Sequence, residues 1–206
     1  MSTKVKICGI TSVEDGLAAA EAGADMIGLM FYEGSPRFIS LEQAADISRA
    51  LPPFLMRVGV FVNAPADLVM QAIAQCNLTM LQFHGDENSE FCTQFGLMSL
   101  KAFRTRDESS LEQLENYETD AFLLDAHSKN GLGGTGETFN WDLAIAARKF
   151  NKPIFLAGGL TPINVAEAVR QVRPFGVDVS SGVESAPGKK DHAKVKAFIA
   201  AAKSVA

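Results

Sequence analysis

Two residues with acid–base side chains come directly at the end of short apolar runs. Cys8 ends the run Lys-Val-Lys-Ile-Cys, and Asp125 follows four apolar residues at 121–124. A thiol in such a place can act as a base once its neighbours stabilise the thiolate. A carboxyl group among bulky apolar neighbours has a raised pKa and can act as a general acid. The alternatives are a buried, unreactive thiol and a carboxylate that only caps a loop.

Two turns rich in glycine and serine follow later apolar runs. Gly158 and Gly159 form the first turn, and Ser180, Ser181 and Gly182 form the second. Glycine lets backbone N–H groups approach an anion closely, and the serine hydroxyls add further donors. On adjacent strands, the two turns predict a phosphate site, and hence a phosphorylated metabolite as the ligand. The alternative is that the glycines only allow tight turns.

Arg37 and His84 complete the set of candidate binding residues. Arg37 follows a proline in a loop, and its planar guanidinium suits bidentate recognition of a carboxylate. A solvated surface arginine is the alternative. His84 ends another apolar run, where a substrate contact or a satisfied structural histidine would both fit. The chain has only three His and three Cys, too few and too unevenly spaced for a zinc site, so we expect no metal. An acid and a base on opposite sides of a bound phosphosugar suit a proton-transfer isomerisation that needs no cofactor.

These candidates lie in a regular alternation of apolar runs and amphipathic stretches. The expected strands are residues 4–8, 25–31, 56–62, 79–83, 100–103, 121–125, 153–157 and 176–180. The expected helices are residues 11–22, 40–51, 65–75, 88–95, 109–116, 141–150, 162–172 and 191–203. Capping boxes are predicted for the first two helices, formed by Thr11 with Glu14 and by Ser40 with Gln43.

Eight strand–helix units share 206 residues, which leaves about 26 for each. A strand of ~5, a helix of ~11 and two short loops need little less than that. Continuously apolar strands are typical of a parallel sheet that is covered on both faces. Eight consecutive units favour a closed barrel over the alternative, an open doubly wound sheet, although the pattern alone does not prove closure. We therefore predict one (β/α)₈ barrel domain over residues 1–206, close to minimal length, with its active site at the carboxyl ends of the strands. Strands one and six are then not neighbours, and Cys8 faces Asp125 across the mouth.

Composition narrows the classes of partner and the location. Asp and Glu number 24 against 19 Lys and Arg, a net charge of −5, which leaves no basic excess for nucleic acid. The apolar stretches end within about seven residues, far short of the ~20 that span a bilayer, and the first residues lack the apolar region of a signal peptide. Unpaired thiols suit a reducing compartment. We expect a cytoplasmic protein that is a monomer.

A glycine-rich segment at residues 131–136 matches the dinucleotide-binding pattern G-x-G-x-x-G. In that fingerprint the helix opens directly after the strand, whereas five residues intervene here. The acidic residue expected ~20 positions later is also missing. We expect this segment to be a mobile flap over the site, next to Asp125.

Six motifs along the chain carry a family resemblance. They are Lys-Ile-Cys-Gly-Ile-Thr at 6–11, Ser-Pro-Arg at 35–37, Gln-Phe-His-Gly at 82–85, Gly-Gly-Thr-Gly at 133–136, Ala-Gly-Gly-Leu at 157–160 and Asp-Val-Ser-Ser-Gly-Val-Glu at 178–184. In this order they resemble the phosphoribosylanthranilate isomerase family of tryptophan biosynthesis. Phe83 and Asn140 depart from the family pattern, which has leucine and commonly aspartate there.

The resemblance implies an Amadori rearrangement of N-(5-phosphoribosyl)anthranilate to 1-(2-carboxyphenylamino)-1-deoxyribulose 5-phosphate, without metal or organic cofactor. It implies that Asp125 protonates the ribose ring oxygen and that Cys8 removes the C2′ proton. Arg37 would hold the anthranilate carboxylate, and the glycine–serine turns would hold the phosphate. His84 matches a motif position without a defined role. Such chemistry requires a lowered pKa for the thiol and a raised one for the carboxyl group.

Two other functions are considered beside this one. The first is another phosphate-binding barrel enzyme, such as a ribulose-phosphate epimerase or the indole-forming barrel of the same pathway. An epimerase of that kind needs metal-binding His and Asp residues at several strand ends, and the chain has three His in all. The second is a non-catalytic barrel that binds a phosphorylated ligand, which would leave an opposed acid and base unexplained.

Overall fold

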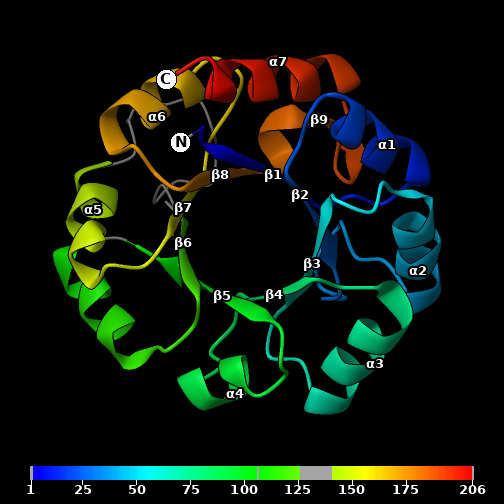
Figure 1. Ribbon diagram of the computed structural model, residues 1–206, viewed down its shortest axis with the longest axis horizontal. Coiled ribbons are helices and arrows are strands. Elements are labelled where there is room, and N and C mark those ends of the chain that lie inside the picture. The colour runs from blue at the N-terminus through cyan, green and yellow to red at the C-terminus, as the bar shows by residue number, and fades with distance from the viewer. Residues whose placement is uncertain (1, 106, 126–140, 206) are drawn as a thin grey trace.

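The computed structural model describes residues 2–105, 107–125 and 141–205. Eight parallel strands form a closed barrel in which each strand pairs with the next and β8 pairs with β1 (Figure 1). The strands are β1 (Lys4–Cys8), β2 (Met26–Met30), β3 (Met56–Phe61), β4 (Met80–Phe83), β5 (Met98–Arg104), β6 (Ala121–Asp125), β7 (Ile154–Ala157) and β8 (Gly176–Val179). The predicted (β/α)₈ barrel is confirmed.

Helices surround the barrel on its outside, as Figure 1 shows. The α-helices are α1 (Val13–Glu21), α2 (Leu41–Ala50), α3 (Ala66–Cys76), α4 (Ser89–Thr93), α5 (Trp141–Ala146), α6 (Val165–Val172) and α7 (His192–Lys203). A 3₁₀ helix, Glu108–Asn116, takes the place of an α-helix after β5, and another, Ala147–Phe150, extends α5. None of the helices in the described part of the chain combines the length and apolar character that crossing a bilayer requires.

The two predicted helix caps have different outcomes. Ser40 and Gln43 form the predicted capping box at the start of α2. The box predicted for Thr11 and Glu14 is wrong by one residue, because the side chain of Ser12 accepts the N–H of Asp15 and caps α1. The Thr11 hydroxyl instead donates to the carbonyl of Gly188, far along the chain. A tertiary contact has replaced the local one.

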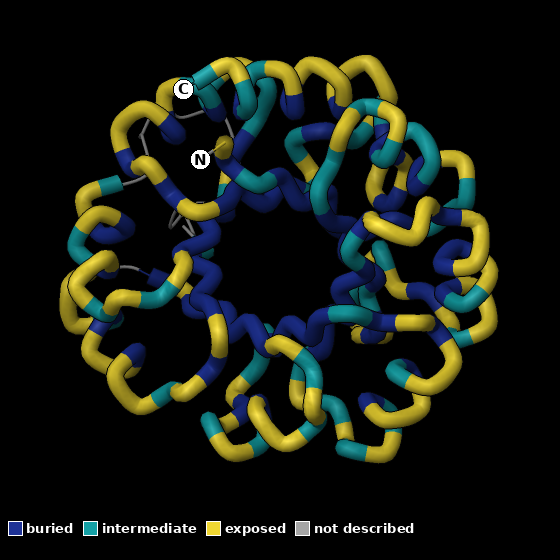
Figure 2. Tube along the Cα trace, in the orientation of Figure 1, coloured by how far each residue is buried: buried dark blue, intermediate teal, exposed yellow. Residues whose placement is uncertain are grey.

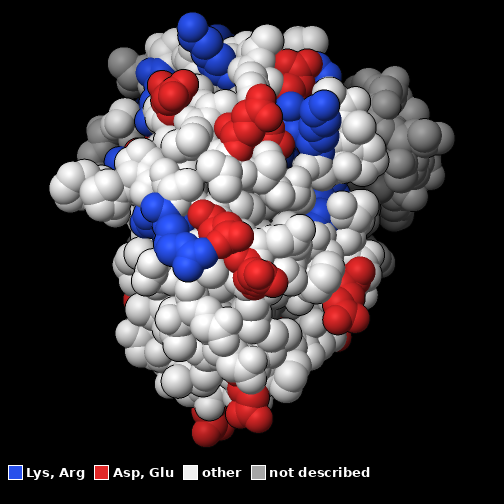
Figure 3. Space-filling model, turned by 90° about the vertical axis from the view of Figure 1, so that its right-hand side faces the viewer, with Lys and Arg blue, Asp and Glu red and all other residues white. Residues whose placement is uncertain are grey.

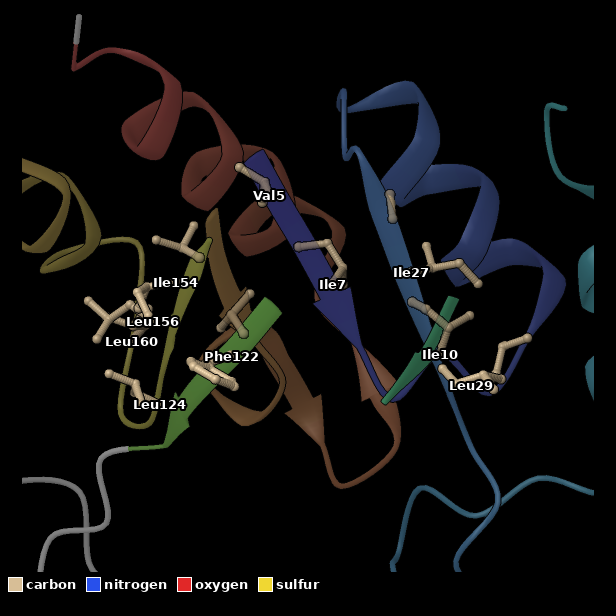
Figure 4. Close-up of a cluster of buried hydrophobic side chains, with 14 of the residues drawn as sticks. Val5, Ile7, Ile10, Ile27, Leu29, Phe122, Leu124, Ile154, Leu156 and Leu160 are labelled. Atoms are coloured by element: carbon tan, nitrogen blue, oxygen red, sulfur yellow. The ribbon is translucent and has the colours of Figure 1, made fainter. Parts of the chain in front are cut away.

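Side chains alternate along each strand and so divide the core into two clusters. Figure 4 shows outward side chains under the helices, namely Val5 and Ile7 of β1, Ile27 and Leu29 of β2, Phe122 and Leu124 of β6, and Ile154 and Leu156 of β7. Inward side chains fill the barrel itself: Met26, Val58, Met80, Leu100, Ala102, Ala121, Leu123, Phe155 and Ala157. The strands are therefore buried on both faces, as the ring of buried residues in Figure 2 shows.

One element was not predicted from the sequence. After β8 and a short 3₁₀ turn (Ser181–Val183), a small antiparallel hairpin forms from β9 (Glu184–Ala186) and β10 (Lys189–Lys190). Gly188 turns the hairpin with a φ of +80°, a conformation that glycine adopts readily. The hairpin lies on the same end of the barrel as the candidate residues.

Candidate active site

The catalytic candidates occupy the carboxyl ends of two strands that do not touch. Cys8 is the last residue of β1 and Asp125 is the last residue of β6. In the closed barrel β7 and β8 separate these strands, so the prediction that they are not neighbours is confirmed. The other candidates gather around one or the other of these two residues, or in the turns after β7 and β8.

Cys8 is buried, with 6% of its surface exposed. It lies opposite Gly28 of β2 in the strand register. A Cβ at position 28 would come within 2.6 Å of the Cys8 Sγ and 3.1 Å of the Lys6 Nζ, so the thiol and the ammonium group converge on this glycine. Burial raises the pKa of the Cys8 thiol, and the Lys6 ammonium opposes that rise without cancelling it. The mechanism implied by the resemblance asks for a lowered thiol pKa, whereas burial leaves the pKa of Cys8 above its ordinary value.

Lys6 precedes Cys8 by two residues and so faces the same interior of the barrel. Its side chain has no exposed surface, and its Nζ donates to Oδ1 of Asp178 on β8 at 2.9 Å. Burial alone lowers the pKa of Lys6, but Asp178 and Cys8 outweigh burial and leave that pKa above its ordinary value. Lys6 therefore keeps its positive charge beside the thiol.

Arg37 is fixed by a carboxylate. Its Nε and Nη2 donate to the two carboxylate oxygens of Glu184, both at 2.7 Å. The Glu184 bonds raise the pKa of Arg37. Burial tends to raise the pKa of Glu184, but the bonds from Arg37 and Lys190 lower it below its usual range. Arg37 is thus a fully charged, partly buried group rather than a solvated surface arginine.

The stem of Arg37 lies against the turn that follows Cys8. A Cβ on Gly9 would meet the Arg37 Cδ at 2.5 Å and the Ser180 Oγ at 3.1 Å. Gly9 also has a φ of +71°, which a side chain would strain. Cys8, Arg37 and Ser180 are therefore brought together around a residue that must remain small.

Asp125 lies beside His84, which directly follows β4. The distance from His84 Nε2 to Asp125 Oδ2 is 3.4 Å. On its other side, His84 Nδ1 is 3.2 Å from Nε2 of Gln82, a residue only 1% exposed. When the amide N–H donates to Nδ1, the ring proton is on Nε2 and faces the carboxyl group of Asp125. The structure thus places His84 next to the candidate acid.

The turns after β7 and β8 touch one another. A Cβ on Gly182 would overlap the carbonyl oxygen of Leu160, so the two turns pack without space for a side chain. Gly158 and Gly159 have φ angles of +86° and +65°, and a Cβ on Gly159 would meet no atom within 4 Å. Backbone amides in such turns are accessible to an anion.

Ser180 adds a hydroxyl to these turns. Its Oγ is buried and has no hydrogen-bond partner among the described residues. Ser181, the next residue, begins the 3₁₀ turn. The five residues predicted for the phosphate therefore lie at two turns on neighbouring strands, as expected from the sequence.

The glycine-rich segment at 131–136, which the sequence predicts to be a flap, lies outside the described residues. Within residues 2–105, 107–125 and 141–205, no three His, Cys, Asp or Glu side chains come together in a way that could hold a metal ion.

Five polar residues of this region were not predicted from the sequence. They are Lys6, Gln82, Asp178, Glu184 and Lys190. The first three precede Cys8, His84 and Ser180 by two residues, so the two-residue period of a strand could have placed them on the same inward face. Glu184 and Lys190 lie on the unpredicted hairpin and carry no comparable signal.

Comparison with known proteins points to one family. The model of the family described as N-(5'phosphoribosyl)anthranilate (PRA) isomerase matches residues 5–201. The N-(5'-phosphoribosyl)anthranilate isomerase of Geotalea uraniireducens is 57% identical over 203 residues, which cover 98% of this chain and all of the relative. That of Geobacter metallireducens is 54% identical over 98% of this chain and 99% of the relative.

Solved structures agree with the sequence matches. Phosphoribosyl anthranilate isomerase from Thermotoga maritima has a TM-score of 0.92 and 44% identity over 98% of this chain and 99% of that one. A phosphoribosyl anthranilate isomerase in complex with reduced 1-(o-carboxyphenylamino)-1-deoxyribulose 5-phosphate has a TM-score of 0.89 and 43% identity over the same shares. A 3-hexulose-6-phosphate synthase from Salmonella typhimurium, 12% identical with a TM-score of 0.71, shares the fold alone.

Proposed function

Because the chain belongs to the N-(5'-phosphoribosyl)anthranilate isomerase family, we propose that the residues at the carboxyl ends of its strands perform that isomerisation by acid–base catalysis. The reaction is an Amadori rearrangement of an aldose amine to a ketose amine, and it serves tryptophan biosynthesis. No atoms are gained or lost, so the protein has only to bind the substrate and to move protons.

Asp125 is the general acid of this proposal. It donates a proton to the ribose ring oxygen as the bond from that oxygen to C1′ breaks, and the anthranilate nitrogen then forms the double bond of a Schiff base. Its position at the end of β6, 3.4 Å from His84 Nε2, supports this role, because the imidazole orients the carboxyl group.

Cys8 is the general base. Its thiolate takes the proton from C2′, and the electron pair of that bond forms the double bond of an enolamine, which tautomerises to the ketose. The single observation that carries the proposal is the buried Lys6 ammonium next to the Cys8 thiol, since it stabilises the thiolate within the barrel. A thiol whose pKa is raised by burial is deprotonated less often, but its thiolate is a stronger base.

Different residues bind the two ends of the substrate. Arg37 binds the anthranilate carboxylate, and Gly158, Gly159, Ser180, Ser181 and Gly182 bind the phosphate. The relative that is in complex with the reduced product carries a carboxyl group and a phosphate on one ligand, which is the charge pattern these two groups of residues would match. In this scheme His84 lies beside Asp125 and contacts the bound substrate.

The test follows the fluorescence of the anthranilate group. Purified protein in EDTA is mixed with freshly made N-(5-phosphoribosyl)anthranilate, and the spontaneous decomposition of the substrate serves as the control. We expect rapid loss of fluorescence with the unaltered chain and a loss of activity of about 10²–10⁴-fold in Asp125→Asn, the usual contribution of a general acid. Activity of Asp125→Asn within a few-fold of the unaltered chain would remove Asp125 from the mechanism.

A single catalytic domain, a monomer and a cytoplasmic location are further parts of the proposal. The three cysteines are free and buried, which suits a reducing compartment, and acidic and basic side chains are interspersed on the face in Figure 3 rather than gathered in a basic patch. A relative from Thermotoga maritima is described as dimeric, so the mass of this chain in solution, measured by light scattering, is the direct test.

A further inference from the structure

We propose that Glu184 is a positioning residue that holds the Arg37 guanidinium in the orientation that binds the substrate carboxylate. The inference rests on the proposed role of Arg37. Selectivity for a carboxylated ring then depends on Glu184 of the hairpin after β8 as well as on Arg37 of the loop after β2.

The geometry of the pair selects one edge of Arg37. A guanidinium group carries five N–H donors, and Glu184 takes two of them along the Nε edge, through Nε and Nη2. The end-on edge, formed by Nη1 and the second hydrogen of Nη2, makes no hydrogen bond to any described residue. That edge has the spacing to receive a second carboxylate in a bidentate manner. Glu184 therefore determines which edge of Arg37 faces a ligand.

The combined charge of Arg37, Glu184 and Lys190 still attracts an anion. A lone glutamate would neutralise Arg37 and repel an incoming carboxylate. Lys190 prevents this, because its Nζ donates to the same Glu184 Oε1 at 2.9 Å and its side chain has no exposed surface. Burial lowers the pKa of Lys190, and its bond to Glu184 opposes that fall. When both cations are protonated, Arg37, Lys190 and Glu184 together carry one net positive charge. The site can hold Arg37 still and remain attractive to an anion.

The hairpin is docked on the loop that carries Arg37. Glu184 and Lys190 are partners across the hairpin, next to a shift in its register. Between them, a Cβ on Gly188 would lie 3.1 Å from the carbonyl oxygen of Pro36, and the Gly188 carbonyl accepts the Thr11 hydroxyl. The position of Glu184 is thus tied to the residue just before Arg37, so the guanidinium is oriented before the ligand arrives.

The test separates the carboxylate from the rest of the ligand. Two probes are used, reduced 1-(o-carboxyphenylamino)-1-deoxyribulose 5-phosphate and the same compound without its carboxyl group. Their dissociation constants are measured by calorimetry on the unaltered chain and on Glu184→Gln. We expect Glu184→Gln to reduce the preference for the carboxylated probe by about tenfold or more, while affinity for the other probe changes by less than about twofold. KM rises and kcat stays within about threefold.

Other variants separate the possible failures. Arg37→Gln should abolish the preference; if it does not, the proposed role of Arg37 is wrong. If Arg37→Gln abolishes it and Glu184→Gln leaves it intact, or weakens both probes equally, the positioning role alone is overturned. Because Glu184→Gln leaves Lys190 buried without its carboxylate, the double variant Glu184→Gln/Lys190→Met provides the same measurement if the single variant does not fold.

Discussion

Two lysines are buried with a carboxylate at the same distance, on opposite sides of the barrel wall. Lys6 of β1 faces the inside and donates to Asp178 at 2.9 Å. Lys101 of β5 faces the outside and donates to Glu87 at 2.9 Å. Their side chains are 0% and 3% exposed. Since burial and distance are so similar, any difference in what the two pairs do must come from their other neighbours.

The outer pair is surrounded by backbone groups. Lys101 also donates to the carbonyl of Gly85 at 2.7 Å, and the two oxygens of Glu87 accept the N–H groups of Asn63 and Gly85 at 2.7 and 2.9 Å. The pair therefore ties together the loops that follow β3 and β4. Burial raises the pKa of the nearby Cys92 thiol to about 12, with Lys101 lowering it and Glu87 raising it, and Cys92 lies in α4 on the outside of the barrel. The outer pair therefore lies away from the candidate catalytic residues and serves the structure.

The inner pair lies beside a thiol at the carboxyl end of a strand, among the candidate catalytic residues. Lys6 and Asp178 act on the pKa of Cys8 in opposite directions, Lys6 lowering it and Asp178 raising it. A buried ammonium next to an ionisable sulfur changes how often that sulfur is charged. Both lysines lower the pKa of a nearby thiol, so the place of that thiol, at a strand end or in a surrounding helix, separates a lysine that tunes chemistry from a structural one.

The largest expected effect is on Cys8 itself. Cys8→Ala should lower kcat by about 10³-fold or more, because it removes the base that takes the C2′ proton. Binding of the reduced product analogue should change by less than about threefold, since alanine is smaller and the residue is already buried. Calorimetry and the fluorescence assay give both values. Turnover within a few-fold of the unaltered chain would contradict the assignment of the base.

Lys101→Met should act on stability and not on chemistry. It leaves the Glu87 carboxylate buried without its ammonium, so we expect the free energy of unfolding to fall by about 3–5 kcal/mol. Urea unfolding measures the loss, and kcat of the folded protein should stay within about threefold. A fall in kcat above tenfold, with stability unchanged, would contradict the structural role of the Lys101–Glu87 pair.

Lys6→Met should act on chemistry through pH. The Lys6 ammonium lowers the pKa of Cys8, so its removal raises that pKa further. The increase of kcat/KM with pH, which follows deprotonation of Cys8, therefore moves to higher pH. At neutral pH we expect kcat/KM to fall by up to about tenfold for each unit by which the pKa of Cys8 rises, because fewer molecules carry the thiolate although each thiolate is a stronger base. Lys101→Met is the matched control and should leave the pH profile in place. An unchanged profile in Lys6→Met would remove Lys6 from the tuning of Cys8.

The smallest expected effect comes from adding one methyl group to the inner face or to the outer face of the barrel wall. Gly28→Ala places a Cβ 2.6 Å from the Cys8 Sγ, and Gly59→Ala places one 2.6 Å from Leu78 on the outside. Both variants should lose about 1–3 kcal/mol of stability through overpacking. Only Gly28→Ala should also lower kcat, by about tenfold, because it displaces the thiol. Equal kcat in the two variants would contradict this difference.

The candidate residues that could be predicted from the sequence share one property. Cys8, His84, Asp125 and Ser180 each lie at or just after the end of a strand, and the (β/α)₈ barrel gathers strand ends at one rim. Their catalytic and binding roles stay predictions. Residues buried beneath that rim were harder to find, because a lysine within a strand such as Lys6 has no local sequence signal for its partner.

The partner of Arg37 could not be predicted from the sequence either. Its place in a loop and its chemistry could be predicted from neighbouring residues, but its partner Glu184 is 147 positions away. The hairpin that carries Glu184 is short and pairs through only a few residues, so its pattern is too weak to identify. Thr11 was assigned to a helix cap for a similar reason, since the contact with Gly188 lies 177 positions away.

The order of the eight strand–helix units and the family could be inferred without coordinates, because they depend on local hydrophobic periods and on motifs that are contiguous in the chain. Eight repeats favour a closed barrel, but the pairing of β1 with β8 that closes it joins strands from the two ends of the chain and is known only from the structure. The direction of the Cys8 pKa, the charge of Lys6 and the orientation of Arg37 became known only from the folded chain. These properties arise from burial and from charges that distant segments bring within about 3 Å of one another, where Coulomb and desolvation energies are largest.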